Sequence, residues 1–287
     1  MPDFLESTVE SAALAWLAEL SIPGLHDDAI APDGPHPERE TFEQVVLRGR
    51  LRSALERLNP HIPASARSGA VDEAIRRIER AETQSPLVNH HAFHRLLVEG
   101  VEVSFRVGPD LKHDKVWLAD FAHPEANDWL AVQQFTITGH HAKTGVRTHR
   151  RPDIVLFLNG LPVVVFELKN AADADATIGQ AFNQLRTYTD DIGQLFTYAG
   201  LLVISDGTQA RLGALGAGWE HFKPWRDPAG PPRSELRTLI ESALAPARLL
   251  DLIRSFTVFE RDGDRVTMKV AAYHQVQAVN RAVERTV

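Results

Sequence analysis

Apolar residues at helical spacing mark the first part of the chain. Residues 5–20 and 41–58 each repeat apolar side chains every three or four positions, which predicts two amphipathic helices. The segment between them, 22–40, is rich in Pro, Gly and Asp and is predicted to be a loop. A shorter apolar stripe predicts a third helix around 71–81. The beginning of the chain is therefore expected to be mainly helical.

The pattern changes after residue 100. Short runs rich in β-branched and aromatic residues, partly alternating with period two, predict strands at 101–107, 116–120 and 129–139. Two longer apolar runs then meet at Asn159-Gly160, a dipeptide that suits the positive φ angles of a tight hairpin turn. We therefore expect a β-hairpin centred on this dipeptide.

The remaining sequence alternates helical and strand patterns. Apolar residues on one face predict a helix over 176–189, and the run at 199–207 predicts a buried strand. The stretch DPAGPPRSE at 227–235 has the composition of a linker. Further along we expect a helix near 234–254, short strands at 256–260 and 265–270, and a helix from Tyr273 to the end. This order predicts an α/β or α+β core.

Composition narrows the possible classes of protein. Hydrophobic residues make up 44% of the 287 residues and charged residues 24%, which excludes a disordered chain, a collagen and a coiled coil. The absence of Cys excludes disulfides, thiolate zinc sites, iron–sulfur clusters and a Cys nucleophile. Any metal must therefore bind His, Asp or Glu. The N-terminal residues lack the features of a signal peptide and no run is long enough to span a membrane, so we expect a cytoplasmic protein.

The predicted hairpin brings acidic residues together. A turn at Asn159-Gly160 places Asp153 opposite Phe166 or Glu167, and Glu167 shares a strand face with Lys169. Because an unpaired buried charge costs several kcal/mol, these groups should be paired with one another or bound to an ion. The residues alone leave open a structural Lys–carboxylate pair and a Mg²⁺ site for phosphodiester hydrolysis, in which Lys169 would position the nucleophile or neutralise the transition state.

A basic segment directly precedes Asp153. It contains Lys143, Arg147, Arg150 and Arg151 and no acid. Because the net charge of the chain is −7, any nucleic-acid contact must come from such a local patch. The segment is predicted to be either a solvated loop or an edge that grips phosphates without reading sequence.

Three short motifs resemble a nuclease superfamily. They are Pro152-Asp153, then Glu167-Leu168-Lys169, and then Gln184 and Tyr188, which lie four residues apart on one face of a predicted helix. Together they resemble the PD-(D/E)xK nucleases, in the branch that carries a Q-x-x-x-Y helix. Longer stretches such as RRPDIVLFLNGLPVVVFELKN and AFNQLRTYTDDI resemble the N-terminal part of the R subunit of type I restriction enzymes, a similarity that runs from about Leu5 to the C-terminus.

The resemblance implies an architecture and an activity. It implies a restriction-endonuclease-like α/β fold with a mixed sheet flanked by helices over residues 1–226, with a mainly helical arm at 1–85 and the core at 86–226. Residues 227–287 would form a linker and the truncated beginning of an ATP-dependent, helicase-like motor domain. The implied activity is Mg²⁺-dependent endonucleolytic cleavage of unmodified double-stranded DNA, with Mn²⁺ able to substitute. Specificity and methyltransferase subunits would supply sequence recognition.

The resemblance also assigns roles to residues. Asp153 and Glu167 match the metal-binding acids, Lys169 the catalytic lysine, and Gln184 and Tyr188 the accessory motif. The basic residues of segment 143–151 would contact DNA.

Two further assignments concern the ends of the chain. The superfamily often adds an acid from the first helix to the metal site; Glu10 is the candidate, and Glu6, one turn away, is an alternative. Gln275 matches a position that reads adenine in helicases, although it could also be a polar residue on an amphipathic helix. The chain has no G-x-x-x-x-G-K-[ST] phosphate loop, so we expect ATP to bind the complete subunit only and no ATP hydrolysis by this chain alone.

Two rival functions and two weaker motifs remain. The rivals are a catalytically idle scaffold that docks on the methyltransferase core, and a stand-alone DNA repair nuclease of the same superfamily. His90 and His94 have a spacing that can bind zinc on a helix, but no third ligand is evident. The run GALGAG at 213–218 superficially resembles a phosphate loop, but it lacks the lysine and is expected to be a turn.

Overall fold

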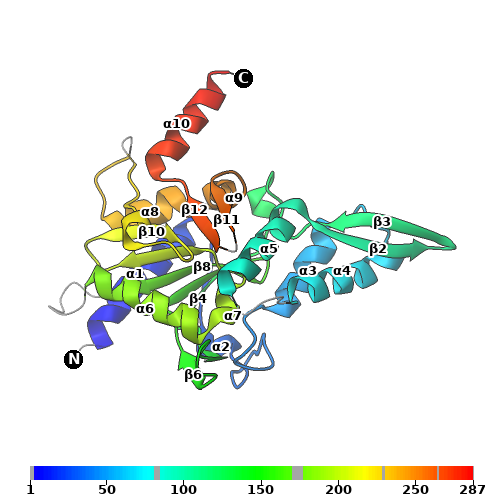
Figure 1. Ribbon diagram of the computed structural model, residues 1–287, viewed down its shortest axis with the longest axis horizontal. Helices are drawn as coiled ribbons and strands as arrows, with labels where there is room; N and C mark the ends of the chain where they lie inside the picture. Colours follow the sequence, from blue (N-terminus) through cyan, green and yellow to red (C-terminus); the bar gives the residue numbers. More distant parts are fainter. Residues whose placement is uncertain (1–2, 81–84, 170–176, 228–229, 264, 287) are drawn as a thin grey trace.

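A mixed six-stranded sheet lies at the centre of the molecule (Figure 1). The computed structural model describes residues 3–80, 85–169, 177–227, 230–263 and 265–286, with side chains from residue 8 onward. The β1/β4 and β8/β9 pairs are parallel, and the other neighbouring pairs are antiparallel. The strands in spatial order are β1 (Gly24–His26), β4 (Trp129–Gln133), β7 (Ile154–Leu158), β8 (Leu161–Leu168), β9 (Leu201–Ser205) and β10 (Ala210–Ala214). The expected α/β class with a mixed sheet is confirmed.

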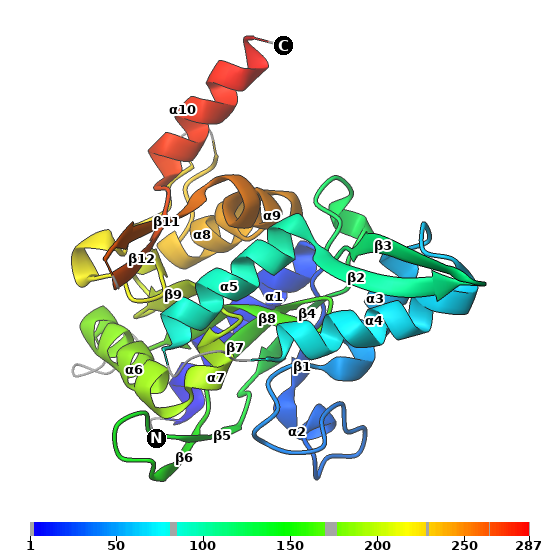
Figure 2. The same cartoon turned by 45° about the vertical axis from the view of Figure 1, so that its right-hand side comes forward.

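Three two-stranded sheets accompany the central sheet in the described residues. In Figure 2 the β2–β3 hairpin lies beside α3 and α4, and β5 and β6 lie below the sheet. Their strands are β2 (Val101–Val107) with β3 (Asp110–Val116), β5 (Ile137–His140) with β6 (Arg147–Arg150), and β11 (Thr257–Asp262) with β12 (Arg265–Val270). The longer helices are α1 (Asp3–Glu19), α3 (Arg48–Leu58), α4 (Ala64–Ile78), α5 (Pro86–Glu99), α6 (Ile178–Asp191), α8 (Glu235–Ala243), α9 (Pro246–Ser255) and α10 (Tyr273–Glu284).

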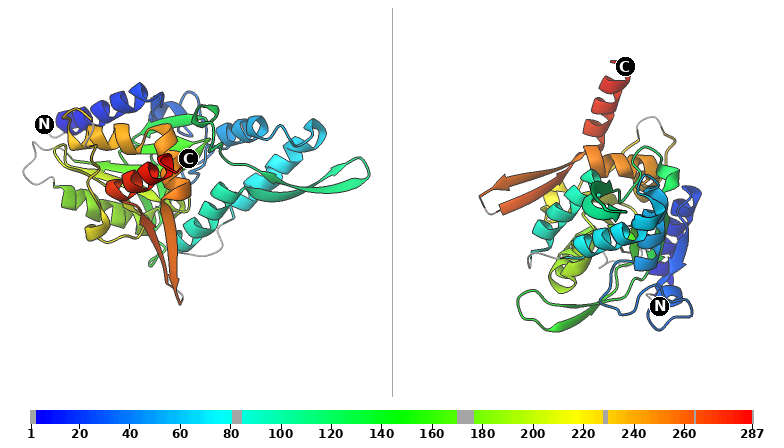
Figure 3. Two further views of the ribbon diagram at one scale, coloured as in Figure 1. Left: turned by 90° about the horizontal axis from the view of Figure 1, so that it is seen from above. Right: turned by 90° about the vertical axis from the view of Figure 1, so that its right-hand side faces the viewer.

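Helices cover both faces of the sheet. Seen from above in Figure 3, α1 and α8 lie on one side and α6 on the other. Helix α1 contacts β4 and β8, whereas α6 contacts β8 and β9. The two central strands β7 and β8 are therefore buried on both faces, and every residue in both strands is buried. This explains why their sequences are almost continuously apolar.

Several predicted elements have different limits in the structure. The helix predicted over 41–58 begins only at Arg48, because the preceding segment uses its backbone in tertiary hydrogen bonds: Leu47 N donates to Gly160 O, and Phe42 O accepts from Thr138 N. The helix predicted near 234–254 is two helices, α8 and α9, with Pro246 at the start of the second. Proline lacks the N–H needed inside a helix.

The strand predictions also needed correction. The run 129–139 forms two strands in different sheets, β4 and β5, separated at Gln134, where φ is +58°. Residues 117–120 are not a strand, since β3 ends at Val116. The helix predicted at 71–81 spans 64–78 instead, and α5 was not predicted as an element.

The predicted loop 22–40 contains an edge strand of the central sheet. Gly24–His26 pairs in parallel with Ala131–Gln133 of β4. The short helix α2 (Asp27–Ile30) follows at once. Three residues are too few to show a period of two, so this strand exists only because β4 is beside it.

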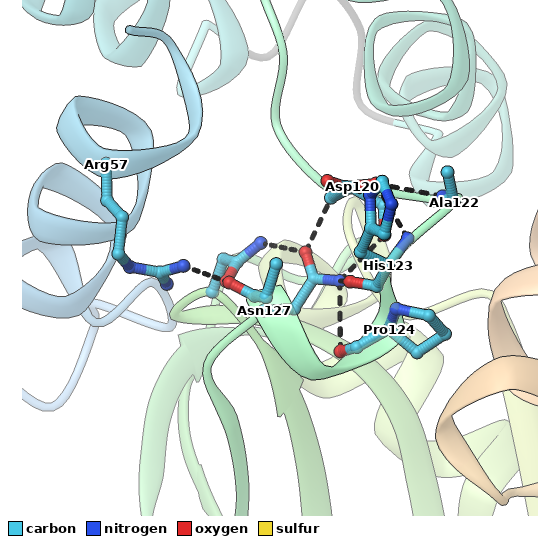
Figure 4. A network of polar contacts seen from close by, with 8 residues as sticks. Arg57, Asp120, Ala122, His123, Pro124 and Asn127 are labelled. Atoms are coloured by element: carbon cyan, nitrogen blue, oxygen red, sulfur yellow. Dashed lines mark hydrogen bonds and ion pairs between the residues drawn. The ribbon is translucent and has the colours of Figure 1, made fainter.

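The hairpin at Asn159-Gly160 is confirmed, and its turn is buried. Both residues have positive φ, +53° and +80°. The Asn159 side chain donates to Leu118 O and to Asn127 Oδ1, each at 2.9 Å, and accepts from Asp128 N at 2.7 Å. Figure 4 shows the loop that holds Asn127, in which its side chain bonds the backbone of Asp120. This network anchors the end of the hairpin that lies away from Asp153.

Candidate active site

The hairpin register brings Asp153 and Glu167 together. Ile154 pairs with Phe166 across β7 and β8 at the end of the hairpin away from the turn, and the register shifts only between Leu156 and Phe157. Continuing this register outward places Asp153 opposite Glu167, one of the two partners that were predicted. The Asp153 carboxylate accepts a hydrogen bond from Leu168 N at 2.6 Å, which fixes its orientation.

Both acids of this pair are buried. Asp153 is 7% exposed and Glu167 is 0% exposed. Burial, followed by the charge of Glu167, raises the pKa of Asp153 well above its usual value. Lys169 Nζ lies 2.6 Å from Glu167 Oε1, so the predicted Lys–carboxylate contact is present. The ammonium balances one carboxylate, and two close acids still repel.

Glu10 reaches the same site from α1. It is 3% exposed, and its carboxylate accepts hydrogen bonds from the side-chain amides of Gln133 at 2.7 Å and Gln134 at 2.8 Å. The Gln134 amide also lies 3.4 Å from Asp153 Oδ1. The structure thus places Glu10 beside Asp153 through Gln134. The side chain of Glu6 lies outside the described residues.

Gln133 and Gln134 are site residues that the sequence analysis missed. The signal available was two adjacent amides directly after the apolar run of β4. Gln134 adopts a left-handed backbone conformation, which is uncommon for residues other than glycine. Its N–H donates to Asp153 O at 2.8 Å, and this bond couples the β4–β5 turn to the start of β7.

Helix α6 contributes the predicted glutamine and tyrosine. A capping box between Thr177 and Gln180 begins the helix. Gln184 Nε2 donates to Tyr188 Oη at 2.6 Å, and Tyr188 is buried. Burial and the neighbouring charge of Glu167 raise the pKa of Tyr188, which keeps its hydroxyl protonated. Both side chains line the cleft.

These residues surround a polar cleft of about 870 Å³. Arg150 and Arg151 line it, whereas Lys143 and Arg147 are exposed elsewhere on the β5–β6 segment and do not. The Arg150 guanidinium binds Asp191 at 2.7 Å, so part of its charge is already neutralised. The cleft is lined by Glu10, His26, Gln133, Gln134, His149, Arg150, Arg151, Asp153, Lys169, Asn183, Gln184, Thr187 and Tyr188.

Other candidate residues lie apart from the cleft. Gln275 caps α10, because its side-chain oxygen accepts from Ala272 N at 2.8 Å. Gly213 and Ala214 lie in β10, where a turn was predicted, whereas Gly216 has a φ of +75°, as expected for a turn.

The two spaced histidines are structural. His90 Nδ1 lies 3.3 Å from Thr197 O, and His94 Nε2 lies 2.8 Å from Ile253 O. Among the described residues, no group of three His, Asp or Glu side chains is placed to hold a metal ion, which applies to His90 and His94 and equally to the predicted set of Asp153, Glu167 and Glu10. The zinc alternative therefore has no support in this part of the chain.

The burial of His90 predicts acid sensitivity. Desolvation and the charge of His94 lower the pKa of His90 from 6.5 to about 3. Below pH 6.5 the unfolded chain therefore binds a proton that the folded chain does not, so stability falls as the pH falls. We expect this residue to remove about 2 kcal/mol of unfolding free energy between pH 7 and pH 5, with the slope approaching about 1.4 kcal/mol per pH unit towards pH 5. Urea unfolding between pH 7 and pH 5 measures this slope.

A pair of variants isolates the contribution of His90. His90→Asn should flatten the slope, whereas His113→Asn, at an exposed position on β3, should leave it unchanged. An equal slope in the wild type and in His90→Asn would contradict the assignment.

Comparison with known proteins identifies the family. The family described as Type I restriction enzyme R protein N terminus matches residues 3–226. The chain belongs to this family. It is therefore an N-terminal region of a type I restriction R subunit, as the sequence resemblance implied.

The relatives are endonuclease subunits by name. The chain is 41% identical over 257 residues to the type I restriction enzyme HindI endonuclease subunit of Haemophilus influenzae, covering 87% of this chain and 24% of that protein. It is 27% identical over 304 residues to a putative type I restriction enzyme MjaIXP endonuclease subunit of Methanocaldococcus jannaschii, covering 97% of this chain and 27% of that protein. The chain thus spans about a quarter of the length of these relatives. None of the described helices has the length and apolar character of a membrane span.

Proposed function

We propose that this R-subunit region is a Mg²⁺-dependent nuclease domain that hydrolyses phosphodiester bonds of double-stranded DNA. The observation that carries the proposal is that Asp153 and Lys169 line one cleft, while the buried Glu167 contacts the Lys169 ammonium at 2.6 Å. The side chains belong to the PD-(D/E)xK pattern of the sequence, and Arg150 and Arg151 lie at the cleft wall where a phosphate would approach.

The acids fit a hard divalent cation. Mg²⁺ favours one or two carboxylates together with several waters, so Asp153 and Glu167 suffice as direct ligands. Burial, followed by the charge of Glu167, raises the pKa of Asp153, and a bound cation would favour the ionised carboxylate. Glu10, whose carboxylate is held by two amides, would contact the ion through a water. Mn²⁺ prefers similar oxygen ligands and should substitute. When bound, the metal supplies an activated water and stabilises charge on the phosphate.

Side chains that line the cleft would orient the phosphate and neutralise its negative charge. The Lys169 ammonium is held by Glu167 at the base of the cleft, where it can stabilise the negative charge that develops on the phosphate. Arg151 is exposed at the wall and can bind a neighbouring phosphate. Tyr188 stays protonated, so the Gln184–Tyr188 pair offers hydrogen-bond donors to the site.

DNA recognition and the use of ATP would depend on partner subunits and on the rest of the R subunit. We propose that specificity and methyltransferase subunits supply recognition of unmodified DNA. ATP would act through the complete subunit, with Gln275 as the candidate contact to the nucleotide. The contacts expected from the cleft are to phosphates, which give affinity without sequence information.

Calorimetric titration of Mn²⁺ into the purified chain tests the metal site. We expect binding to the wild type and its loss in Asp153→Asn and in Glu167→Ala, because each removes one of two carboxylate ligands. Circular dichroism verifies that each variant is folded, and Asp128→Asn, an acid that pairs with Arg50 away from the cleft, is the matched control. Retained binding in both site variants would refute the assignment of these acids as ligands.

A further inference from the structure

Two arginines next to the cleft lie on aromatic rings instead of carboxylates. The Arg186 guanidinium is 5.9 Å from the centre of the Phe182 ring, and that of Arg211 is 4.5 Å from the Trp219 ring. Within the described residues neither forms an ion pair, although arginines such as Arg150 do. Their positive charges are therefore not neutralised by contacts within this part of the chain.

The rings that these arginines contact belong to a packed cluster of Phe182, Trp219 and Phe222, here called the aromatic platform. Phe182 meets the Trp219 and Phe222 rings edge to face, at 5.6 and 5.1 Å between centres. Phe222 is buried against β10, where a Cβ on Gly213 would lie only 2.6 Å from its ring. Arg211 also donates to Phe222 O at 3.4 Å. The platform therefore fixes Arg211 in place.

The platform adjoins the cleft and carries positive charge. Asn183 and Thr187, on the same turn of α6 as Arg186, line the cleft. Figure 2 shows α6 on the same side of the molecule as the segment that follows β10. Residues 209–226, which include β10, contain three cations, with Arg211 in β10 among them, and a single acid, Glu220, whose side chain is 71% exposed beside His221.

We propose that Arg186 and Arg211 bind backbone phosphates of duplex DNA that extends beyond the cleft over α6. This inference rests on the proposed nuclease function and adds a second contact surface to it. The Arg211 guanidinium, 4.5 Å from the ring centre, and that of Arg186, at a cation–π distance of 5.9 Å, have no carboxylate partner among the described residues, so their N–H donors can bind a phosphate. Base stacking on Trp219 is disfavoured, because Arg211 covers one face of its ring and Phe182 meets the ring edge to face.

Fluorescence anisotropy with a labelled duplex tests the surface. The titrations use the full chain in EDTA, which prevents metal-dependent cleavage, at several salt concentrations. We expect Arg186→Gln and Arg211→Gln each to lower the slope of log Kd against log salt by about 0.9, and the double variant by about 1.8. Affinity at 0.1 M salt should fall roughly 8-fold for each single variant.

Controls separate this inference from the proposed function. Arg106→Gln, an exposed arginine on β2, should leave slope and affinity unchanged. If the double Gln variant unfolds, the double Lys variant, which keeps both charges, should retain the wild-type slope. A wild-type slope in a folded Gln variant would overturn this inference and leave the nuclease proposal intact. Absence of duplex binding by the wild type would overturn both the phosphate-binding inference and the nuclease proposal.

The nature of the contact is tested with a single strand of equal length. Tighter binding of the single strand, lost in Trp219→Leu, would indicate base stacking and overturn the phosphate assignment. Preference for the duplex supports it.

Discussion

Asp153→Asn in the R subunit of an assembled restriction enzyme should reduce DNA cleavage by at least about 10³-fold. The substitution removes one of two carboxylates proposed to hold the metal, and a metal contributes several kcal/mol of transition-state stabilisation. The amide retains the shape of the carboxylate and an oxygen that can accept from Leu168 N. Initial rates of plasmid cleavage with Mg²⁺ and ATP measure the effect.

The fold should survive this change. Because burial and Glu167 raise the pKa of Asp153 above its unfolded value, the ionised form costs stability at neutral pH. The neutral amide removes that cost, so the melting temperature should not fall. Asp128→Asn serves again as the matched control for cleavage. Unchanged cleavage by Asp153→Asn would favour the idle scaffold, and wild-type cleavage without ATP or partner subunits would favour a stand-alone nuclease.

Arg39→Ala should destabilise the chain by about 3–5 kcal/mol, because it leaves a buried carboxylate without its cation. The Arg39 and Asp27 side chains are 0% and 2% exposed, and their charged atoms lie 2.5 Å apart. Arg39 also donates to Thr136 O at 2.7 Å and lies over the Phe135 ring. Urea unfolding at pH 7 measures the loss.

An exposed ion pair should contribute much less to stability than the buried Arg39–Asp27 pair. Arg52 pairs with Asp72 where both side chains are about two-fifths exposed, so Arg52→Ala should cost less than about 1 kcal/mol. Similar losses for the two variants would contradict the argument. A double variant, Asp27→Leu with Arg39→Met, should recover part of the stability because it removes both charges together.

The Asp27–Arg39 pair also supports the site. Asp27 accepts from Thr136 N at 3.0 Å, so both main-chain polar groups of Thr136 are held by the pair. Thr136 is two residues from Gln134, whose left-handed backbone aims its amide at Glu10 and Asp153. A buried ion pair in the loop that precedes α3 thereby helps to position a residue in the cleft.

Local signals in the sequence determined the hairpin and its acids. Asn159-Gly160 favours positive φ regardless of its surroundings, and strand alternation then places Asp153 against Glu167 and aligns Glu167 with Lys169. The spacing of Gln184 and Tyr188 placed both on one helix face. The family, too, could be identified from these motifs. Each of these inferences needed only the geometry of one element.

Tertiary structure decided the features that depend on partners distant in sequence. Strand β1 forms because β4 offers an edge, and the segment before Arg48 leaves the predicted helix because its backbone bonds the hairpin turn and β5. Gln134 enters the site through a backbone conformation that no local pattern specifies. Arg150 and Arg151 reach the cleft while Lys143 and Arg147 do not, although the four are close in sequence. Hydrogen bonds and packing between segments that are distant in sequence override local conformational preference. The sequence pattern therefore determines which catalytic side chains the hairpin carries, but not which other residues line the cleft.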